Sequence, residues 1–296
     1  MTIKNNKITF LVTGGSGFLG NKLSNHLSSK GYKVIIYDKS KPKKINLNQE
    51  YIKGDLIKTN NLKTIINKID YVYHFAGMAD IEESNSNPLE CIKNNILGTS
   101  NILDLLTNSK KLKRFVFASS IYIYSQKGGF YKISKLCCEK IIEEYSKTKK
   151  INFSILRFGS IYGPGANKFN WINNILNDAI KNKKIIRYGD GNEIRNYIHI
   201  NDAVNLCFKV INEEKNKNDF IIIKGIDQIK IKDLLTMISE IFNNEIKLIY
   251  KKKKNSDHYA ITPYSYNEKV AKQIIPEDFV DLGEGLLDCI KFIKNN

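Results

Sequence analysis

Short apolar runs alternate with amphipathic segments along most of the chain. The apolar runs predict strands near residues 8–13, 33–38, 51–54, 70–76, 113–119 and 152–158. Apolar residues at three- and four-residue spacing predict helices near residues 18–30, 58–68, 88–108, 130–148, 169–183, 202–213, 232–243 and 283–294. Strands that alternate with helices in this way predict an α/β fold, a doubly wound parallel sheet covered by helices on both faces.

The regular order loosens after residue 165. We expect residues 1–165 and 195–223 to form the sheet-based domain, and residues 166–194 and 224–296 to form a smaller C-terminal substrate-binding lobe. At 296 residues the chain is long enough to bury a core of this size. Ligands bind preferentially between such lobes, beyond the carboxyl ends of parallel strands.

A glycine-rich turn follows the first predicted strand and precedes the first predicted helix. Gly14, Gly17 and Gly20 have the spacing G-x-x-G-x-x-G, which suits a tight turn, a close approach of backbone to pyrophosphate, and packing of helix on strand. A glycine pattern alone is weak evidence, but the strand before it and the helix after it are the context that a dinucleotide site requires. The candidate cofactor-binding residues of this segment are Gly14, Ser16, Gly17, Phe18, Leu19 and Gly20.

The second predicted strand ends in an acidic residue. Asp38 lies about 20 residues beyond the glycine turn, the distance at which a carboxylate accepts a hydrogen bond from the ribose 2′-hydroxyl of NAD. No arginine follows it to hold a 2′-phosphate, so the pattern favours NAD over NADP. Lys39 and Lys41 are the residues that weigh against this preference.

Tyr131 and Lys135 are four residues apart in a predicted helix, so their side chains share one face. A free tyrosine titrates near pH ~10, and an adjacent ammonium favours the phenolate. Ser120 closes a predicted strand upstream, where its hydroxyl can hold a substrate oxygen. Together the three residues can take a proton from a carbinol while a cofactor takes the hydride.

Further motifs follow in a fixed order along the chain. They are residues 54–56 (Gly-Asp-Leu), 74–77 (His-Phe-Ala-Gly), 94–99 (Asn-Asn-Ile-Leu-Gly-Thr), 117–124, 156–165 and 195–202. Together with the glycine turn and the Tyr131/Lys135 pair, they resemble the extended short-chain dehydrogenase/reductase family. The resemblance is to its nucleotide-sugar epimerases and dehydratases, of the UDP-glucose 4-epimerase type, and it covers nearly the whole chain.

This resemblance implies a Rossmann domain that binds NAD, and it implies roles for particular residues. The adenine would contact Asp55 and Leu56, the pyrophosphate would lie beside Phe75, Ala76 and Gly77, and Asn95 would lie beneath the nicotinamide. Tyr131, Lys135 and Ser120 would be catalytic, and Tyr131 and Lys135 would also contact the cofactor. The resemblance further implies a homodimer in which helices 88–108 and 130–148 pair across a two-fold axis.

Arginine is scarce in this lysine-rich chain, which makes its positions informative. Arg195 lies in a motif that resembles the diphosphate-binding segment of the family, and its planar fork can bind a phosphate in a bidentate manner. Arg157 lies inside a predicted strand and is interpreted as structural. The candidate substrate-binding residues are Ser120, Ser160, Asn170, Arg187, Arg195 and Tyr264.

Three departures from the family pattern bear on the activity. Dehydratases carry Asp-Glu directly after the active serine or threonine, whereas Ile121 and Tyr122 stand here, so no acid at these positions can expel a 6-hydroxyl as water. The loop between Tyr124 and Tyr131 is shorter than usual for the family, and Ser160 stands where many members have asparagine. We interpret the chain as an NAD-dependent nucleotide-sugar epimerase that inverts C4 through a 4-keto intermediate. An NAD(P)-dependent nucleotide-sugar 4-keto reductase or dehydrogenase is the alternative enzyme.

The net charge of +17 introduces a different class of function, a non-catalytic family member that binds RNA. The lysines are spread along the chain, and a pure binder has no reason to keep Ser120, Tyr131 and Lys135. We therefore expect a nucleotide-sugar substrate and no nucleic-acid partner. The roles of the lysine run 251–254 and of segment 262–266 stay open.

Cysteine usage and hydropathy bear on the compartment. The five cysteines are scattered without metal-binding spacing, which predicts reduced thiols, no metal site and a cytoplasmic location. The polar residues 1–7 do not form a signal peptide, and no apolar stretch approaches the ~20 residues of a membrane span.

Overall fold

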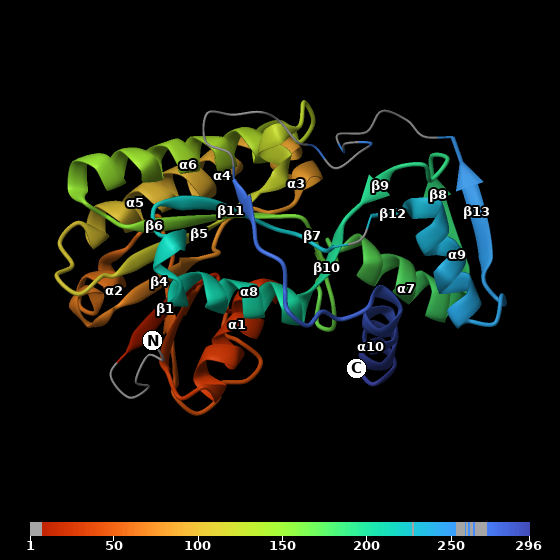
Figure 1. The fold of residues 1–296 in the computed structure, drawn as a ribbon, viewed down its shortest axis with the longest axis horizontal. Helices are drawn as coiled ribbons and strands as arrows, with labels where there is room; N and C mark the ends of the chain where they lie inside the picture. The colour runs from red at the N-terminus through yellow and green to blue at the C-terminus, as the bar shows by residue number, and fades with distance from the viewer. Residues whose placement is uncertain (1–7, 227, 253–257, 259, 261–262, 264–270) are drawn as a thin grey trace.

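A parallel β-sheet forms the centre of the computed structural model, which describes residues 8–226, 228–252, 258, 260, 263 and 271–296 (Figure 1). Its strands are β1 (Thr9–Thr13), β2 (Lys33–Asp38), β3 (Gln49–Lys53), β4 (Tyr71–His74), β5 (Arg114–Ser120), β6 (Phe153–Phe158), β11 (Asp219–Ile223) and β14 (Lys272–Gln273). Over the described residues the sheet has eight strands, in the order β14-β11-β6-β5-β4-β1-β2-β3, and neighbouring strands pair in parallel. The strand order reverses between β1 and β4, which places the ligand crevice at their carboxyl ends. The predicted doubly wound α/β fold is confirmed.

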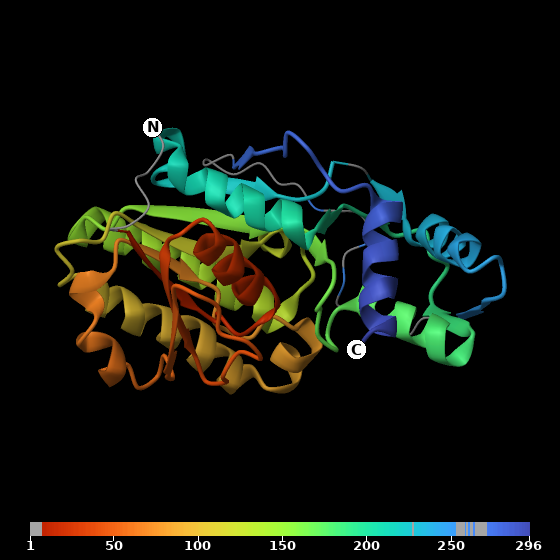
Figure 2. The same cartoon turned by 90° about the horizontal axis from the view of Figure 1, so that it is seen from below.

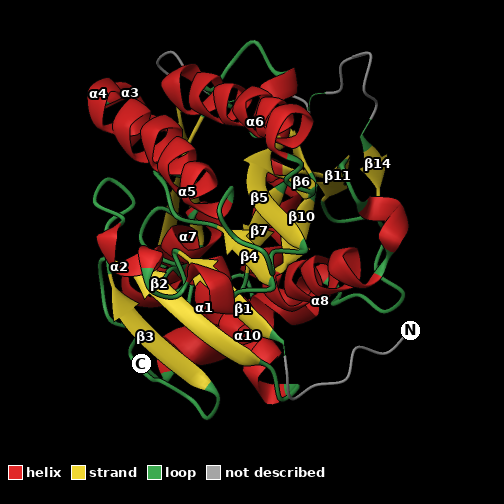
Figure 3. Ribbon diagram, turned by 90° about the vertical axis from the view of Figure 1, so that its left-hand side faces the viewer, coloured by secondary structure: helices red, strands yellow, loops and turns green. Residues whose placement is uncertain are grey.

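Alternate residues of the central strands face opposite sides of the sheet and enter two separate cores. Phe10 and Val12 of β1 belong to one core, and Leu11 belongs to the other. Helices α1 (Phe18–Ser29) and α8 (Ile200–Asn212) cover the first core, while α5 (Gly98–Leu106) and α6 (Gly129–Lys149) cover the second (Figure 3). The apolar runs of the sequence are therefore buried on both faces.

Shorter helices complete the side of the sheet that carries α5 and α6. They are α2 (Asn60–Lys63), η2 (Ile66–Lys68), α3 (Ile81–Ser86), α4 (Pro88–Cys91), the π-helical segment η3 (Ile92–Leu97) and η4 (Ile121–Tyr124). The single helix predicted at 88–108 thus consists of α4, η3 and α5 in direct succession. Within the described ranges, no helix has the length and apolar character needed to cross a membrane.

A third hydrophobic core holds a smaller lobe together (Figures 1 and 2). This lobe contains α7 (Trp171–Asn182), β8 (Lys184–Tyr188), β9 (Ile194–Arg195), β12 (Ile229–Lys230), α9 (Ile231–Ile241), β13 (Lys247–Lys251) and α10 (Leu282–Lys294). Strands β7 (Ser160–Tyr162) and β10 (Tyr197–His199) pair in parallel at its junction with the main body. After β6 the chain enters the smaller lobe, and it returns to the main body with α8 and β11. It enters the smaller lobe a second time for β12, α9 and β13. It then adds β14 to the main sheet and ends in α10 of the smaller lobe.

Two details differ from the sequence-based expectation. Helix α8 begins at Ile200, and its N-cap is His199, whose Nδ1 accepts a hydrogen bond from the Asn201 amide, so the expected start at residue 202 was late. Strand β14 joins the main sheet although it lies within residues 224–296, which were assigned to the smaller lobe. Its residues Lys272 and Gln273 are exposed and carry no apolar pattern that would predict a strand.

Candidate active site

The glycine turn after β1 is closed by backbone packing. Gly14 has a φ of +69°, and a Cβ there would lie 2.6 Å from the backbone nitrogen of Ala76, so only glycine fits. A Cβ at Gly20 would lie 2.2 Å from the Gly14 carbonyl oxygen, which brings α1 directly against the turn. Gly17 is the N-cap of α1, where no described side chain caps the helix and no acidic residue occupies the first turn. This helix start suits a pyrophosphate, because unpaired N–H groups and the helix dipole both favour an anion.

The other candidates of this segment lie around the same turn. Phe18 and Leu19 begin α1 and pack partly buried against the first core. The Ser16 amide donates a 3.0 Å hydrogen bond to Oδ2 of Asp38, and the Ser40 amide donates a 2.9 Å bond to Oδ1. The Asp38 carboxylate is thereby fixed beside the glycine turn at the end of β2. This is the position from which a carboxylate accepts a ribose hydroxyl and repels a 2′-phosphate.

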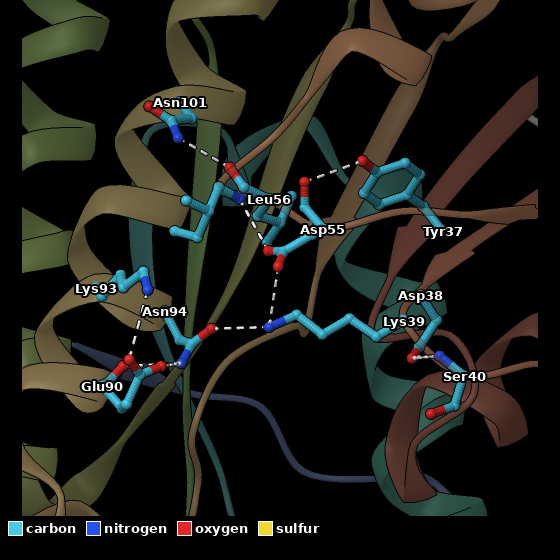
Figure 4. Close-up of polar contacts among 11 residues, drawn as sticks. Tyr37, Asp38, Lys39, Ser40, Asp55, Leu56, Glu90, Lys93, Asn94 and Asn101 are labelled. Atoms are coloured by element: carbon cyan, nitrogen blue, oxygen red, sulfur yellow. Dashed lines mark hydrogen bonds and ion pairs between the residues drawn. The ribbon is translucent and has the colours of Figure 1, made fainter.

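The lysine that follows Asp38 points away from it (Figure 4). Nζ of Lys39 lies 3.3 Å from Oδ2 of Asp55 and donates a 3.1 Å hydrogen bond to Oδ1 of Asn94 on η3. Partial burial acts to raise the pKa of the Asp55 carboxyl, but hydrogen bonds from the Ile57 amide and Lys39 hold it below its ordinary value. The Lys39 ammonium, which could have favoured a 2′-phosphate, is thus paired with Asp55 and Asn94 instead.

Asp55 and Leu56 lie at the end of β3, as expected for an adenine contact. The Tyr37 hydroxyl donates to the backbone carbonyl of Asp55 at 3.2 Å. The side-chain Nδ2 of Asn101 donates to the backbone carbonyl of Leu56 at 2.8 Å (Figure 4). These bonds tie the segment to β2 on one side and to α5 on the other. The segment is therefore held in place by the surrounding protein.

Asn95 links the loop after β4 to the helices beneath it. Its Oδ1 accepts a 2.6 Å hydrogen bond from the Met78 amide, and its Nδ2 donates to the Met78 carbonyl and to Oγ of Ser134. Gly77 has a φ of +145°, and a Cβ there would lie 2.6 Å from Oδ1 of Asn95. The loop formed by Phe75, Ala76 and Gly77 is thus fixed opposite the glycine turn. The turn, Asp38, the β3 end and this loop together form a site that fits a dinucleotide.

Tyr131 and Lys135 lie one turn apart on α6, and both are buried. Nζ of Lys135 lies 6.0 Å from the centroid of the Tyr131 ring and donates a 2.8 Å hydrogen bond to the Ala118 carbonyl on β5. Burial lowers the pKa of Lys135. Ser120 ends β5, and its Oγ accepts a 3.2 Å bond from the Tyr122 amide. The predicted i, i+4 face is confirmed.

A buried ion pair supports this helix from behind. Oε1 and Oε2 of Glu139 accept hydrogen bonds of 3.0 and 2.7 Å from Arg157 on β6, and Oε1 also accepts a 2.6 Å bond from Ser119. Nη1 of Arg157 donates to the Tyr124 hydroxyl. Arg157 is therefore structural, as predicted.

A cleft of about 750 Å³ opens between the main body and the smaller lobe. Its lining includes the predicted residues Ser120, Tyr131, Ser160, Asn170, Arg187 and Arg195. Tyr264 lies outside the described residues. The structure therefore brings residues that are far apart in the sequence to one cavity.

The two arginines of the cleft differ in their contacts. Nη1 of Arg195 on β9 donates to the carbonyls of Ile194 and Ala260, at 2.8 and 3.4 Å. Arg187 on β8 donates a 2.7 Å bond to Oε1 of Glu193, and its guanidinium lies 5.5 Å from the Trp171 ring centroid. The charge of Arg187 is thus already balanced by a carboxylate. The backbone carbonyls that Arg195 contacts carry no net charge.

Asn170 uses its side chain within its own lobe. Its Oδ1 accepts from the Asn173 amide and so caps α7, and its Nδ2 donates to the Ile161 carbonyl at 2.8 Å. It shapes the cleft wall through the direction of α7.

One pair in the cleft was not identified from the sequence. The Tyr122 hydroxyl lies 2.6 Å from Nδ1 of His258, across 136 positions of sequence. Of the two residues, Tyr122 was identified from the sequence, as the replacement of an acid. No local pattern links two positions so far apart.

Comparisons with known proteins agree with this geometry. A model of the NAD dependent epimerase/dehydratase family matches residues 10–223. A UDP-glucose 4-epimerase of Mycoplasma genitalium is 27% identical over 71% of this chain and 74% of its own length. A dTDP-D-glucose 4,6-dehydratase of Dictyostelium discoideum is 30% identical over 68% of this chain and 54% of its own length, so the chain spans about half of that relative.

The fold itself is shared with solved structures. A crystal structure of UDP-glucose 4-epimerase from Thermotoga maritima with UDP-glucose has a TM-score of 0.85 and 23% identity, covering 97% of this chain and 99% of that one.

Proposed function

Because the chain belongs to the NAD dependent epimerase/dehydratase family, we propose that it is a nucleotide-sugar epimerase that inverts C4. It is an enzyme of the extended short-chain dehydrogenase/reductase type, and its cofactor is NAD. NAD, when bound, supplies the acceptor for a hydride and later its donor. Proton transfer and substrate orientation are left to residues of the chain.

Tyr131 takes the proton of the C4 hydroxyl, and Ser120 donates a hydrogen bond to the same oxygen. Lys135, buried beneath the Tyr131 ring, favours the phenolate form by its positive charge. The cleft would let the 4-keto sugar turn to present its other face, and Tyr131 would then return the proton to the C4 oxygen. Supporting this division of roles, Ser120 and Tyr131 share the cleft lining and Lys135 does not.

One observation carries the choice of an epimerase over a dehydratase. The cleft wall directly after Ser120 consists of Ile121, which is buried, and Tyr122, so no carboxylic acid stands there. The acidic residues of the lining, Asp80 and Glu82, lie at the start of α3, where Oδ1 of Asp80 caps the helix by accepting from the Glu83 amide.

In this proposal the smaller lobe, which contains α7, β8, β9, β12, α9, β13 and α10, provides much of the substrate-binding wall. Arg195 binds the diphosphate, because it lines the cleft and its planar guanidinium can form bidentate bonds to phosphate. Ser160, Asn170 and Arg187 line the same cleft, and in this proposal they bind the sugar and the nucleoside.

We also propose a homodimer that forms through the neighbouring helices α4, η3 and α6. Large apolar side chains are exposed along them: Leu89 (80%), Ile92, Leu97, Phe130 and Ile133 (53%). Apolar groups gathered on neighbouring helices commonly mark an interface. Light scattering checks this proposal, and a monomeric mass at micromolar concentration would contradict it.

Family membership and the presence of Ser120, Tyr131 and Lys135 favour an enzyme over the RNA-binding alternative. The experiment that tests the proposal is an assay of the purified protein against UDP-, GDP-, CDP- and dTDP-sugars. The products are separated by chromatography and identified by mass spectrometry. The bound cofactor is identified after denaturation of the protein. Inversion without net consumption of NAD supports the epimerase. Stoichiometric oxidation or reduction would establish the alternative, a 4-keto reductase or dehydrogenase.

A further inference from the structure

A phenol and an imidazole are joined next to the proposed base. The Tyr122 hydroxyl lies 2.6 Å from Nδ1 of His258, and both side chains line the cleft with Tyr131. The Tyr122 ring is edge-on to the Tyr131 ring, at a centroid distance of 6.3 Å and an angle of 76°. The pair therefore borders the place where Tyr131 handles the substrate hydroxyl.

The local backbone is built to hold Tyr122 in this position. Its amide donates to Oγ of Ser120, which fixes it beside the end of β5. Gly128, in the short loop before α6, has a φ of +104°, and a Cβ there would lie 2.9 Å from Cδ1 of Tyr122. The short loop and its glycine thus leave room for the Tyr122 ring against the cleft.

The segment that carries His258 contacts both ends of the cleft's proposed substrate site. The close neighbour of His258 in sequence, Ala260, accepts hydrogen bonds from the Ile194 amide and from the proposed diphosphate ligand Arg195. The imidazole of His258 contacts Tyr122, which lies beside Tyr131. A sugar diphosphate that extends from Tyr131 to Arg195 therefore passes His258 with its sugar end.

We propose that the Tyr122–His258 pair binds a sugar hydroxyl close to the reacting carbon and thereby selects the sugar. This inference rests on the proposed function. A phenol and an imidazole together offer hydrogen-bond donors and an acceptor, which matches a hydroxyl group that both donates and accepts. A site built in this way discriminates against a sugar that lacks the hydroxyl, because the hydrogen bonds between that hydroxyl and the pair are then lost. The candidate hydroxyls are those on C3 and C6.

The test compares UDP-glucose with its 3-deoxy and 6-deoxy analogues. The unmodified protein is expected to prefer UDP-glucose over one analogue by about tenfold or more in kcat/KM, the scale of one buried hydrogen bond. Tyr122→Phe removes only the hydroxyl and should abolish most of this preference, while turnover of that deoxy analogue stays within about twofold. His258→Ala should have the same effect, and the double variant should lose nothing further. Tyr250→Phe, an exposed tyrosine of β13, is the matched control.

The outcomes separate this inference from the proposed function. Equal losses on UDP-glucose and both analogues would mean that Tyr122 only supports the fold around Tyr131, and unchanged preferences would mean that the pair does not contact the sugar; either result overturns the inference. If the unmodified protein turns over no nucleotide-sugar, the proposed function fails. Calorimetric affinities for the same three compounds then decide whether Tyr122→Phe removes a preference in binding.

Discussion

Glu139 and Arg157 form an ion pair inside the protein, with Oε2 of Glu139 2.7 Å from Nη2 of Arg157 and each side chain 2% exposed. Glu139 lies one turn beyond Lys135 on α6, and Arg157 lies on β6. The pair therefore fixes the helix that carries Tyr131 against the sheet that carries Ser120. Because both charges are buried, water cannot solvate either one if its partner is removed.

Glu139→Gln should destabilise the protein by about 3–5 kcal/mol, since it leaves the Arg157 charge buried and uncompensated. Urea unfolding measures this loss. Glu144→Gln on the same helix is the control, because Glu144 pairs with Lys147 at 3.6 Å with both side chains more than half exposed. Its effect should stay below about 1 kcal/mol. Similar losses in the free energy of unfolding in both variants would show that the buried pair contributes no more to stability than the exposed pair.

Tyr131→Phe should lower kcat by about 100-fold or more, the usual scale for the loss of a general base. The amount of bound NAD should hardly change, because the ring remains. Turnover assays and cofactor quantification measure the two effects. Tyr145→Phe, on the same helix but outside the cleft lining, should retain full activity. A Tyr131→Phe variant with near-normal turnover would exclude Tyr131 as the base.

Asp38→Ala should weaken NAD binding and reduce the difference in affinity between NAD and NADP. The carboxylate offers a charge-assisted bond to a ribose hydroxyl, whose loss corresponds to roughly tenfold or more in affinity. Titration calorimetry with both cofactors gives the ratio. Tighter NADP binding by the unmodified protein would contradict the role of Asp38.

Arg195→Lys should raise KM for the nucleotide-sugar about tenfold or more, because a bidentate fork becomes a point contact. Arg187→Lys is the comparison, and it should have a smaller effect because Glu193 already balances the Arg187 charge. Steady-state kinetics on the best substrate of the panel resolve the difference. An unchanged KM in the Arg195→Lys variant would move the diphosphate site elsewhere.

Stability should fall as the pH falls below about 6.5, in part because of His74. Burial, followed by the Lys135 charge, lowers the pKa of this histidine to about 3, and its ring nitrogens contact Oγ1 of Thr13 and of Thr99 at 2.7 and 3.0 Å. The unfolded chain binds a proton below its ordinary pKa of ~6.5 while the native state does not. The free energy of unfolding therefore falls between pH 6.5 and about 3, by up to ~1.4 kcal/mol per pH unit. His74→Gln should reduce this slope in urea unfolding at pH 7, 6 and 5, and an unchanged slope would exclude His74 as a source.

The sequence predicted the elements whose pattern is strong and local. Strands β1, β2, β5 and β6 are buried along nearly all of their length, so their apolar runs are unbroken. The glycine turn and the Tyr131/Lys135 face follow from short spacings with one geometric meaning. By contrast, β8 and β13 are largely exposed and gave no clear strand pattern, although they pair with each other in parallel.

Two contacts between distant positions were not predicted from the sequence. The contact of Lys39 with Asn94 and that of Tyr122 with His258 each depend on how the strands are ordered and how the lobes meet. Periodicity reports which side of an element is buried, but it does not report which side chain of another element lies opposite.

The repeated passage of the chain between main body and smaller lobe has a consequence for evolution. A recombination event that exchanges one continuous gene segment cannot transfer the smaller lobe as a cassette, because β11 and α8 interrupt it and β14 returns to the sheet before α10. New sugar preferences are then reached most directly by point substitutions within the cleft. The ancestry of the two lobes should consequently be shared, and phylogenetic trees built from either lobe should have the same branching order.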